Sequence, residues 1–219
     1  MMQAAANFDR LARIYRLLEM VAFGGDLERA RFRHVNQLAT RRSILILGEG
    51  DGRFLARLLP LVPDAHIHCI DSSAAMLARA EARIASVPGR HQVRFEQANV
   101  LDYTFDAGRY DAVVTLFFLD CFEAEEASQV VERINGGLQA AATWLYADFS
   151  LPDRGVARLR ARLWLGLLYF FFRWQTGLTT RRLPPAEALI RRARFAVAAA
   201  HRLQAGLLHS VHFERGQRV

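Results

Sequence analysis

The chain has 219 residues, 52% of them hydrophobic, which is enough for the core of one domain and short for two. No stretch reaches the ~20 uninterrupted apolar residues that span a bilayer, and the N-terminus lacks the basic-then-apolar order of a secretory signal. Cys69 and Cys121 both lie in apolar, strand-like runs, which predicts reduced, buried thiols rather than a disulfide framework or a metal site. We therefore expect a cytoplasmic protein with one globular domain.

The charge is unevenly distributed along the chain. Residues 1–42 hold eight Arg and four acids (+4), residues 43–150 eight Arg and fifteen acids (−7), and residues 151–219 thirteen Arg and three acids (+10), which sum to the net +7. The basic ends predict contact with something negative, such as an anionic substrate or a membrane surface; the alternative is a solvated face.

Predicted elements alternate between helix and strand. Residues 7–39 have the pattern of one or two helices that precede the first strand. Five strand-like runs follow, at Ser43–Leu47, His66–Ile70, Val93–Phe95, Ala112–Phe118 and Thr143–Phe149. Helical patterns separate them at Arg53–Leu59, from a cap at Ser72 or Ser73 to Ile84, and at Glu123–Asn135, where Gly136 and Gly137 stop the helix. After a long helix over 154–176, the tail carries a helix at Ala186–Arg194 and strands at Val197–Leu203 and Leu207–Phe213.

This rhythm is typical of βαβ units and predicts a Rossmann-like, doubly wound α/β sheet. We expect one domain over residues 1–219. Its parts are a helical cap (7–39), a ligand-binding core (43–150), a lid helix (154–176) and a C-terminal helix with a strand pair (184–219).

The most informative stretch is Gly48–Gly52, where glycines alternate between a buried strand and a helix. Such a turn lets the backbone approach a ligand closely, beside the free N–H groups of the helix. The dinucleotide fingerprint fails here because Arg53 stands where its last glycine is required. Glu49 and Asp51 would repel a pyrophosphate, and they suit the ammonium and sulfonium end of S-adenosylmethionine. A purely structural turn is the alternative.

A second element strengthens this interpretation. Asp71 ends the next strand, nineteen residues after Gly52, where its carboxylate can accept both hydroxyls of a ribose. Alone, Asp71 could be an ordinary helix cap, but the joint spacing of loop, strand and acid favours a nucleoside cofactor.

With these motifs the chain resembles the class I S-adenosylmethionine-dependent methyltransferases, and among them the ubiquinone/menaquinone-biosynthesis C-methyltransferases. The resemblance covers nearly the whole chain, through Phe8–Tyr15, Gly48–Gly52, Ile70–Leu77, Val93–Val100 and Tyr110–Asp120. It implies a seven-stranded mixed sheet with one antiparallel strand near the C-terminal edge. It also implies a set of residues that bind S-adenosylmethionine: Tyr15, Gly48, Glu49, Gly50, Gly52, Asp71, Ser72, Met76, Asn99, Val100 and Thr115.

Two positions depart from the family pattern. The acid that usually stands two residues before the first glycine is replaced by Ile46, and Glu49 is the residue that could compensate. Asn99 stands where an aspartate commonly accepts from the adenine amino group, which an Asn carbonyl can also do. Because the usual acid is missing at Ile46, the alternative is that the chain is a relative that binds the cofactor but does not catalyse methyl transfer.

Methyl transfer from a sulfonium mainly needs alignment, which can remove roughly 7–11 kcal/mol of barrier. A phenol, enol or activated ring carbon would also need a base. Asp120, at the end of the fourth strand, is our candidate catalytic residue. Asp148, His209 and Tyr15 are further candidates, and each can equally be a packed or solvated polar group.

The acceptor is indicated by Leu163–Phe172, ten residues without a charge. As a helix of about 15 Å this run cannot span a bilayer. It predicts an apolar lid over a hydrophobic acceptor that is quinone-precursor-like or lipid-like. Alternatively, residues 158–173 make a peripheral contact with the inner face of the membrane, or the helix is buried in the core or in a homodimer.

A nucleic-acid methyltransferase is a rival suggested by the basic ends. It is disfavoured because Thr115–Leu119 stands where an Asn-Pro-Pro-Tyr-type motif would follow the fourth strand. Nor are aromatic residues interleaved with the Arg clusters as a base-stacking surface requires.

Overall fold

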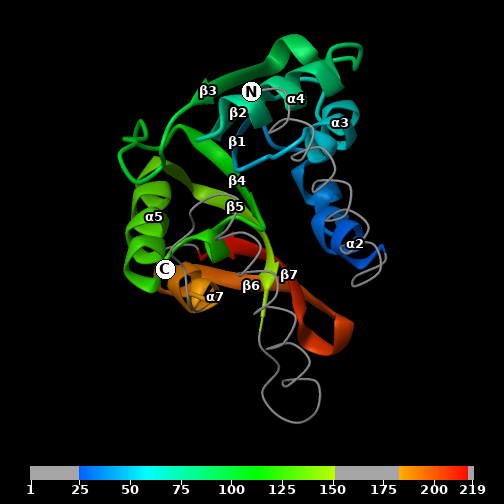
Figure 1. Ribbon diagram of the computed structural model, residues 1–219. Coiled ribbons are helices and arrows are strands. Elements are labelled where there is room, and N and C mark those ends of the chain that lie inside the picture. The colour runs from blue at the N-terminus through cyan, green and yellow to red at the C-terminus, as the bar shows by residue number, and fades with distance from the viewer. Residues whose placement is uncertain (1–24, 151–182, 217–219) are drawn as a thin grey trace, which may run out of the picture.

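Five apolar runs become the parallel part of a seven-stranded sheet in the computed structural model, which describes residues 25–150 and 183–216. The strand order is β3-β2-β1-β4-β5-β7-β6 (Figure 1). The strands are β1 (Ser43–Leu47), β2 (His66–Asp71), β3 (Val93–Gln97), β4 (Tyr110–Leu116), β5 (Leu138–Phe149), β6 (Phe195–Leu203) and β7 (Leu208–Arg215). Because β1 is covered on both faces, its residues show no polar alternation.

The predicted antiparallel strand near the C-terminal edge is confirmed. β7 lies between β5 and β6 and runs antiparallel to both. A 3₁₀ turn at Gln204–Gly206 joins β6 to β7, a short connection that only antiparallel neighbours allow. β6 begins at Phe195, two residues earlier than predicted, because Phe195 is buried edge-to-face against Trp144 with ring centroids 5.5 Å apart.

Helices cover both faces of the sheet (Figure 1). One face carries α2 (Asp26–Phe32), a 3₁₀ turn (Val35–Leu38), α3 (Arg53–Leu58) and α4 (Ala74–Ile84). The other carries α5 (Ala124–Gly137) and α7 (Ala186–Arg192). The cap of α4 is Ser73, whose hydroxyl accepts from the Met76 N–H, and not Ser72.

The helix predicted to stop at Gly136 and Gly137 does end at this pair, but it includes both glycines. Both belong to α5, and the chain passes directly into β5 at Leu138. Gly137 serves close packing, since a Cβ there would lie 2.7 Å from the Cβ of Phe105. β4 also ends earlier than predicted, at Leu116, because Phe117 adopts a left-handed φ of 56° that takes the chain out of the sheet.

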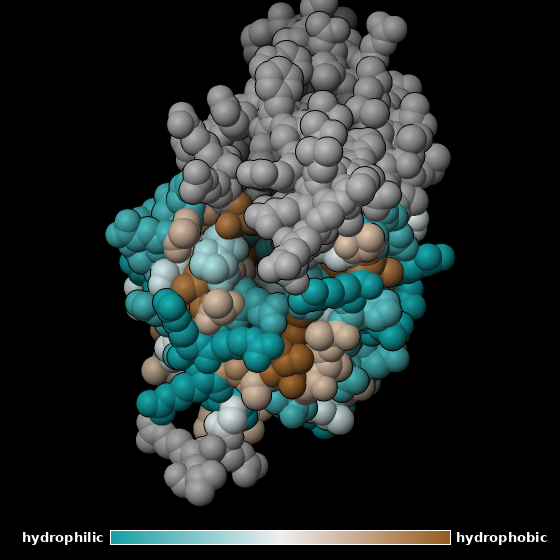
Figure 2. All heavy atoms as spheres, turned by 90° about the horizontal axis from the view of Figure 1, so that it is seen from below, coloured by the Kyte–Doolittle hydropathy of each residue, from teal (hydrophilic) through white to brown (hydrophobic). Residues whose placement is uncertain are grey.

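Several predictions lie outside the described residues: Tyr15, residues 7–24 of the helical cap and the lid helix over 154–176. Within the described ranges no helix is long and apolar enough to cross a membrane. Over the described part of the face in Figure 2, hydrophobic patches are scattered among hydrophilic side chains rather than merged into one large area.

Candidate functional site

The site lies where the strand order reverses, between β1 and β4. In open α/β sheets ligands bind in the crevice outside the carboxyl ends of the strands at such a point. Here β1 continues into the glycine loop, and the Gly48 N–H donates to the Ile70 carbonyl at 3.0 Å, which holds the loop against the end of β2.

The three glycines of the loop have positive φ but different surroundings. φ is 65° at Gly48, 72° at Gly50 and 84° at Gly52. A Cβ at Gly52 would lie 2.7 Å from the backbone Cα of Ala80, so this glycine lets α3 and α4 pack closely. A Cβ at Gly50 would meet no atom of the described residues within 4 Å, so they leave this part of the backbone open to a ligand.

Glu49 caps the helix that follows the loop. Its Oε1 accepts from the backbone N–H groups of Phe54 (2.9 Å) and Leu55 (3.0 Å). Burial raises the pKa of Glu49 to about 8, although these hydrogen bonds and the charge of Arg31 act to lower it. The predicted loop acid therefore has a structural role as well as the charge that we expected it to offer a ligand.

Asp71 ends β2 and joins the glycine loop to the next helix. Its Oδ1 accepts from the Ser73 N–H at 2.9 Å. Burial raises the pKa of Asp71, while backbone hydrogen bonds from Ser73 and Gly50 act to lower it. The carboxylate thus lies directly beside the open glycine of the loop.

A cleft of about 340 Å³ opens at this edge, within the range of about 300–1,000 Å³ typical of ligand sites. Five of the predicted residues line it: Gly48, Asp71, Ser72, Asn99 and Val100. The prediction missed a second group of lining residues: Ala98, Phe117, Phe118, Cys121 and Phe122. The Phe-Phe pair at the end of the fourth strand was the one local signal for them.

The aromatic residues form one wall of the cleft. The rings of Phe118 and Phe122 meet edge-to-face at 5.2 Å. Phe118 also lies over the loop, since a Cβ at Gly48 would be 2.5 Å from its Cδ2. Cys121 lies in a 3₁₀ turn after β4 and not in a strand, so its thiol reaches the cleft rather than the core. A planar apolar group such as a purine base can pack on this wall.

The other predicted binding residues differ in how they lie relative to the cleft. The Asn99 carbonyl oxygen accepts from the Leu101 N–H at 3.1 Å, and one of its lone pairs is left for a ligand. Met76 lies in the first turn of α4, outside the cleft lining. Thr115 is fully buried, and its hydroxyl accepts from the indole N–H of Trp144 at 2.8 Å, so its side chain faces the core.

Asp120, our candidate base, is buried against a second carboxyl group. The Asp120 N–H donates to Asp148 Oδ2 at 3.0 Å, and a hydrogen bond also joins the two side chains. Burial raises the pKa of Asp120 to about 6. Burial and the charge of Asp120 hold the pKa of Asp148 well above its usual range. Two close carboxyl groups cannot both ionise easily, so the pair keeps one proton near neutral pH.

His209, a further candidate base, faces Asp148 across the β5–β7 pair. It is buried, and its Nδ1 lies 3.0 Å from Glu187 Oε2. Burial lowers the pKa of His209 although Glu187 acts to raise it. Glu187 of α7 therefore holds the imidazole ring of His209 in place.

A small second hollow adjoins the cleft and shares Leu47 and Gly48 with it. Its volume is about 10 Å³, the room of one water-sized group. Ile46, Glu49 and Arg31 of α2 line it. The sequence contained no signal for Arg31, which comes from the N-terminal helix.

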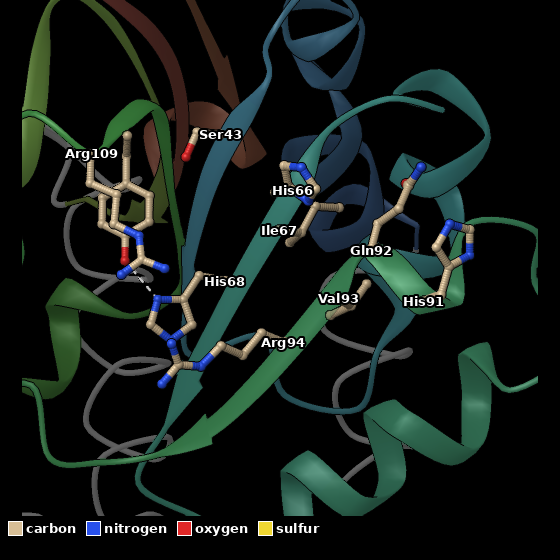
Figure 3. Close-up of a pocket in the computed structure, with 10 residues that line it drawn as sticks. Ser43, His66, Ile67, His68, His91, Gln92, Val93, Arg94 and Arg109 are labelled. Atoms are coloured by element: carbon tan, nitrogen blue, oxygen red, sulfur yellow. Dashed lines mark hydrogen bonds between the residues drawn. The ribbon is translucent and has the colours of Figure 1, made fainter.

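A third hollow, of about 300 Å³, lies at the opposite, amino edge of the sheet (Figure 3). At its base His68 is hydrogen-bonded to the Tyr110 hydroxyl (2.6 Å, dashed in Figure 3) and to Glu96 (2.9 Å). Glu96 also pairs with Arg94 at 2.8 Å. These groups satisfy one another, and the other labelled side chains are spread over β1, β2, β3, the 3₁₀ turn before β3 and the loop before β4 (Figure 3). The described residues therefore offer no convergent set of ligand contacts in this hollow.

Comparison with known proteins agrees with this geometry. Residues 44–140 match the family model described as a methyltransferase domain. A search of curated protein sequences found no match.

Many solved structures share the fold. An O-methyltransferase family protein from Burkholderia thailandensis is 19% identical with a TM-score of 0.68, over 95% of this chain and 62% of that one. A mitomycin 7-O-methyltransferase is 15% identical with a TM-score of 0.66, over 94% and 58%. The chain thus spans about three fifths of the length of these two proteins.

A third similar structure is nearer in length. The 1,6-didemethyltoxoflavin-N1-methyltransferase of Burkholderia thailandensis, which contains its substrate and S-adenosylhomocysteine, is 18% identical with a TM-score of 0.63, over 98% and 89%. The chain therefore has the same Rossmann-like fold as these methyltransferases, and residues 44–140 resemble a methyltransferase domain.

Proposed function

We propose that this chain transfers a methyl group from S-adenosylmethionine to a hydrophobic small-molecule acceptor. One observation supports this most: Gly48 of the glycine loop, Asp71 and an aromatic wall line a single cleft at the switch point of the sheet. The cleft volume fits an adenosine, and the Gly50 backbone lies beside the cleft, hydrogen-bonded to Asp71.

The residues have separable roles in this proposal. Asp71 accepts the ribose hydroxyls, Asn99 and Val100 lie against the adenine, and Phe118 and Phe122 pack on its face. S-adenosylmethionine, when bound, supplies an activated methyl group. The protein then has to position the acceptor and exclude water rather than break a strong bond.

Asp120 is the group we propose as proton acceptor for a hydroxyl or an activated ring carbon. With its pKa raised by burial to about 6, it is mostly ionised at pH 7 yet more basic than an ordinary carboxylate. A hydroxyl acceptor is suggested by the fold neighbours named as O-methyltransferases, and a ring nitrogen by the N1-methyltransferase.

Finer parts of the proposal rest on the sequence patterns alone. They are the single domain over 1–219, a lid over 154–176 that covers a quinone-precursor-like or lipid-like acceptor, peripheral membrane contact through 158–173, a homodimer, and the specific likeness to the ubiquinone/menaquinone C-methyltransferases.

An inactive relative that still binds the cofactor is a second candidate function, and Ile46 favours it because it removes the usual acid.

Calorimetric titration with S-adenosylmethionine, S-adenosylhomocysteine and NADH tests the proposal. We expect micromolar binding of the first two and none of NADH. Asp71→Ala should weaken binding by at least about tenfold, the order of one lost hydrogen bond to a charged group. Asp64→Ala is the matched control, because Asp64 is exposed at the amino edge and its ion pair within the described residues is with Arg42. If Asp71→Ala and Asp64→Ala bind S-adenosylmethionine with equal affinity, Asp71 does not contribute to cofactor binding.

A further inference from the structure

We infer that Arg31 of α2, together with Glu49, binds the amino-acid end of the cofactor in place of the acid missing at Ile46. This inference rests on the proposed function and deepens it. It assigns a residue outside the glycine loop to cofactor specificity.

The usual position for this contact has no polar group. Ile46 is 1% exposed, and its apolar side chain lines the small hollow beside Gly48. An ammonium group against this side chain would lose its hydration without a compensating partner. The α-ammonium and α-carboxylate of a bound cofactor therefore need charged groups from elsewhere around the same hollow.

Arg31 is held at that hollow by its helix. α2 is tied to the sheet where the Ser210 hydroxyl donates to the Ala30 carbonyl at 2.8 Å. It is tied to α3 where Glu28 pairs with Arg53 at 3.3 Å. The Arg31 guanidinium lies over the ring of Phe117, 5.7 Å from its centroid, at the end of β4.

Arg31 offers a positive charge at the small hollow, and Glu49 offers a negative charge there once it releases its proton. Both residues line this hollow, and the charge of Arg31 acts to lower the pKa of Glu49 against the larger effect of burial. Guanidinium groups bind carboxylates through two parallel hydrogen bonds, and a carboxylate is the natural acceptor for an ammonium. The pair is thus complementary to a zwitterionic amino acid, and the hollow has room for one water-sized group such as its ammonium.

The expected consequence is discrimination by the amino-acid end of the ligand. S-adenosylhomocysteine carries that end, whereas 5′-methylthioadenosine has the same adenosine and thioether without it. Loss of Arg31 should weaken the first ligand and leave the second unchanged.

Calorimetry with both ligands on the full chain tests this. Arg31→Met should weaken S-adenosylhomocysteine by about tenfold to hundredfold, the range for a lost charged hydrogen bond, with 5′-methylthioadenosine unaffected. Arg31→Lys should fall between wild type and Arg31→Met, because it keeps the charge and loses the bidentate geometry. Arg33→Met is the control, since Arg33 is exposed at the end of the same helix.

Unchanged binding of S-adenosylhomocysteine to Arg31→Met, or equal weakening of both ligands, would overturn the inference. Equal weakening would mean that Arg31 only supports the shape of the cleft. Failure of wild type to bind either ligand would instead refute the proposed function, so the two failures are distinguishable.

Discussion

Alanine at each glycine of the loop should separate its structural role from its ligand role. Gly50 and Gly52 both have positive φ, so alanine at either position bears a left-handed strain of about 1–2 kcal/mol. Part of this is offset because alanine makes the unfolded chain less flexible, by about 0.4–1 kcal/mol. Gly50→Ala, with no atom of the described residues within 4 Å of the new Cβ, should therefore lower the free energy of unfolding by about 1 kcal/mol.

Gly52→Ala should be much more costly. Its Cβ would lie 2.7 Å from Ala80 Cα and 2.9 Å from Ala80 O, and neither backbone atom can rotate away. Overpacking of this kind adds about 1–3 kcal/mol to the strain. The total destabilisation should be roughly 2–4 kcal/mol.

Urea unfolding followed by circular dichroism measures these differences, and titration with S-adenosylhomocysteine measures binding. Gly50→Ala should stay folded yet bind weakly, because its methyl group occupies the open backbone that we assign to the ligand. Gly52→Ala should lose stability first. The reasoning is refuted if Gly52→Ala is no less stable than Gly50→Ala, or if Gly50→Ala binds like wild type.

Three pH-dependent predictions follow from buried titratable groups. With its pKa raised to about 8, Glu49 is mostly protonated at pH 7, so binding of a cationic cofactor beside it should release a proton. Calorimetry in two buffers of different ionisation enthalpy should detect this release in wild type and not in Glu49→Gln. The Asp120–Asp148 pair holds its proton more tightly when folded, so its contribution to stability is complete below about pH 4 and declines as pH rises through 6. Asp148→Asn should make the fall in unfolding free energy between pH 4 and 8 shallower, by on the order of 1–3 kcal/mol; an unchanged slope in urea titrations would contradict the shared proton. Burial lowers the pKa of His68, so its contribution is complete above pH 6.5 and declines as the pH falls. His68→Gln should reduce the stability lost between pH 7 and 5, and identical losses in wild type and variant would refute this.

Local signals in the chain were sufficient to predict much of the fold. The run Ser43–Leu47 has no polar alternation, a pattern typical of a strand covered on both faces. The alternate glycines of Gly48–Gly52 and the distance to Asp71 indicated the ligand edge, because turn geometry and the length of one βαβ step are short-range properties. Element ends were less certain. Phe195 joins β6 because of a contact with Trp144, fifty-one positions earlier in the chain.

The tertiary structure decided which side chains come together at and around the cleft. Asp120 and Asp148 are twenty-eight positions apart, and only the pairing of β4 with β5 makes them one titrating unit. Arg31 lies on a helix before the first strand, and its place beside Glu49 depends on how α2 packs on β7. Backbone conformation follows from neighbouring residues and can be predicted from them. The charge, burial and pKa of a site depend on contacts between distant segments, which a periodic pattern does not encode.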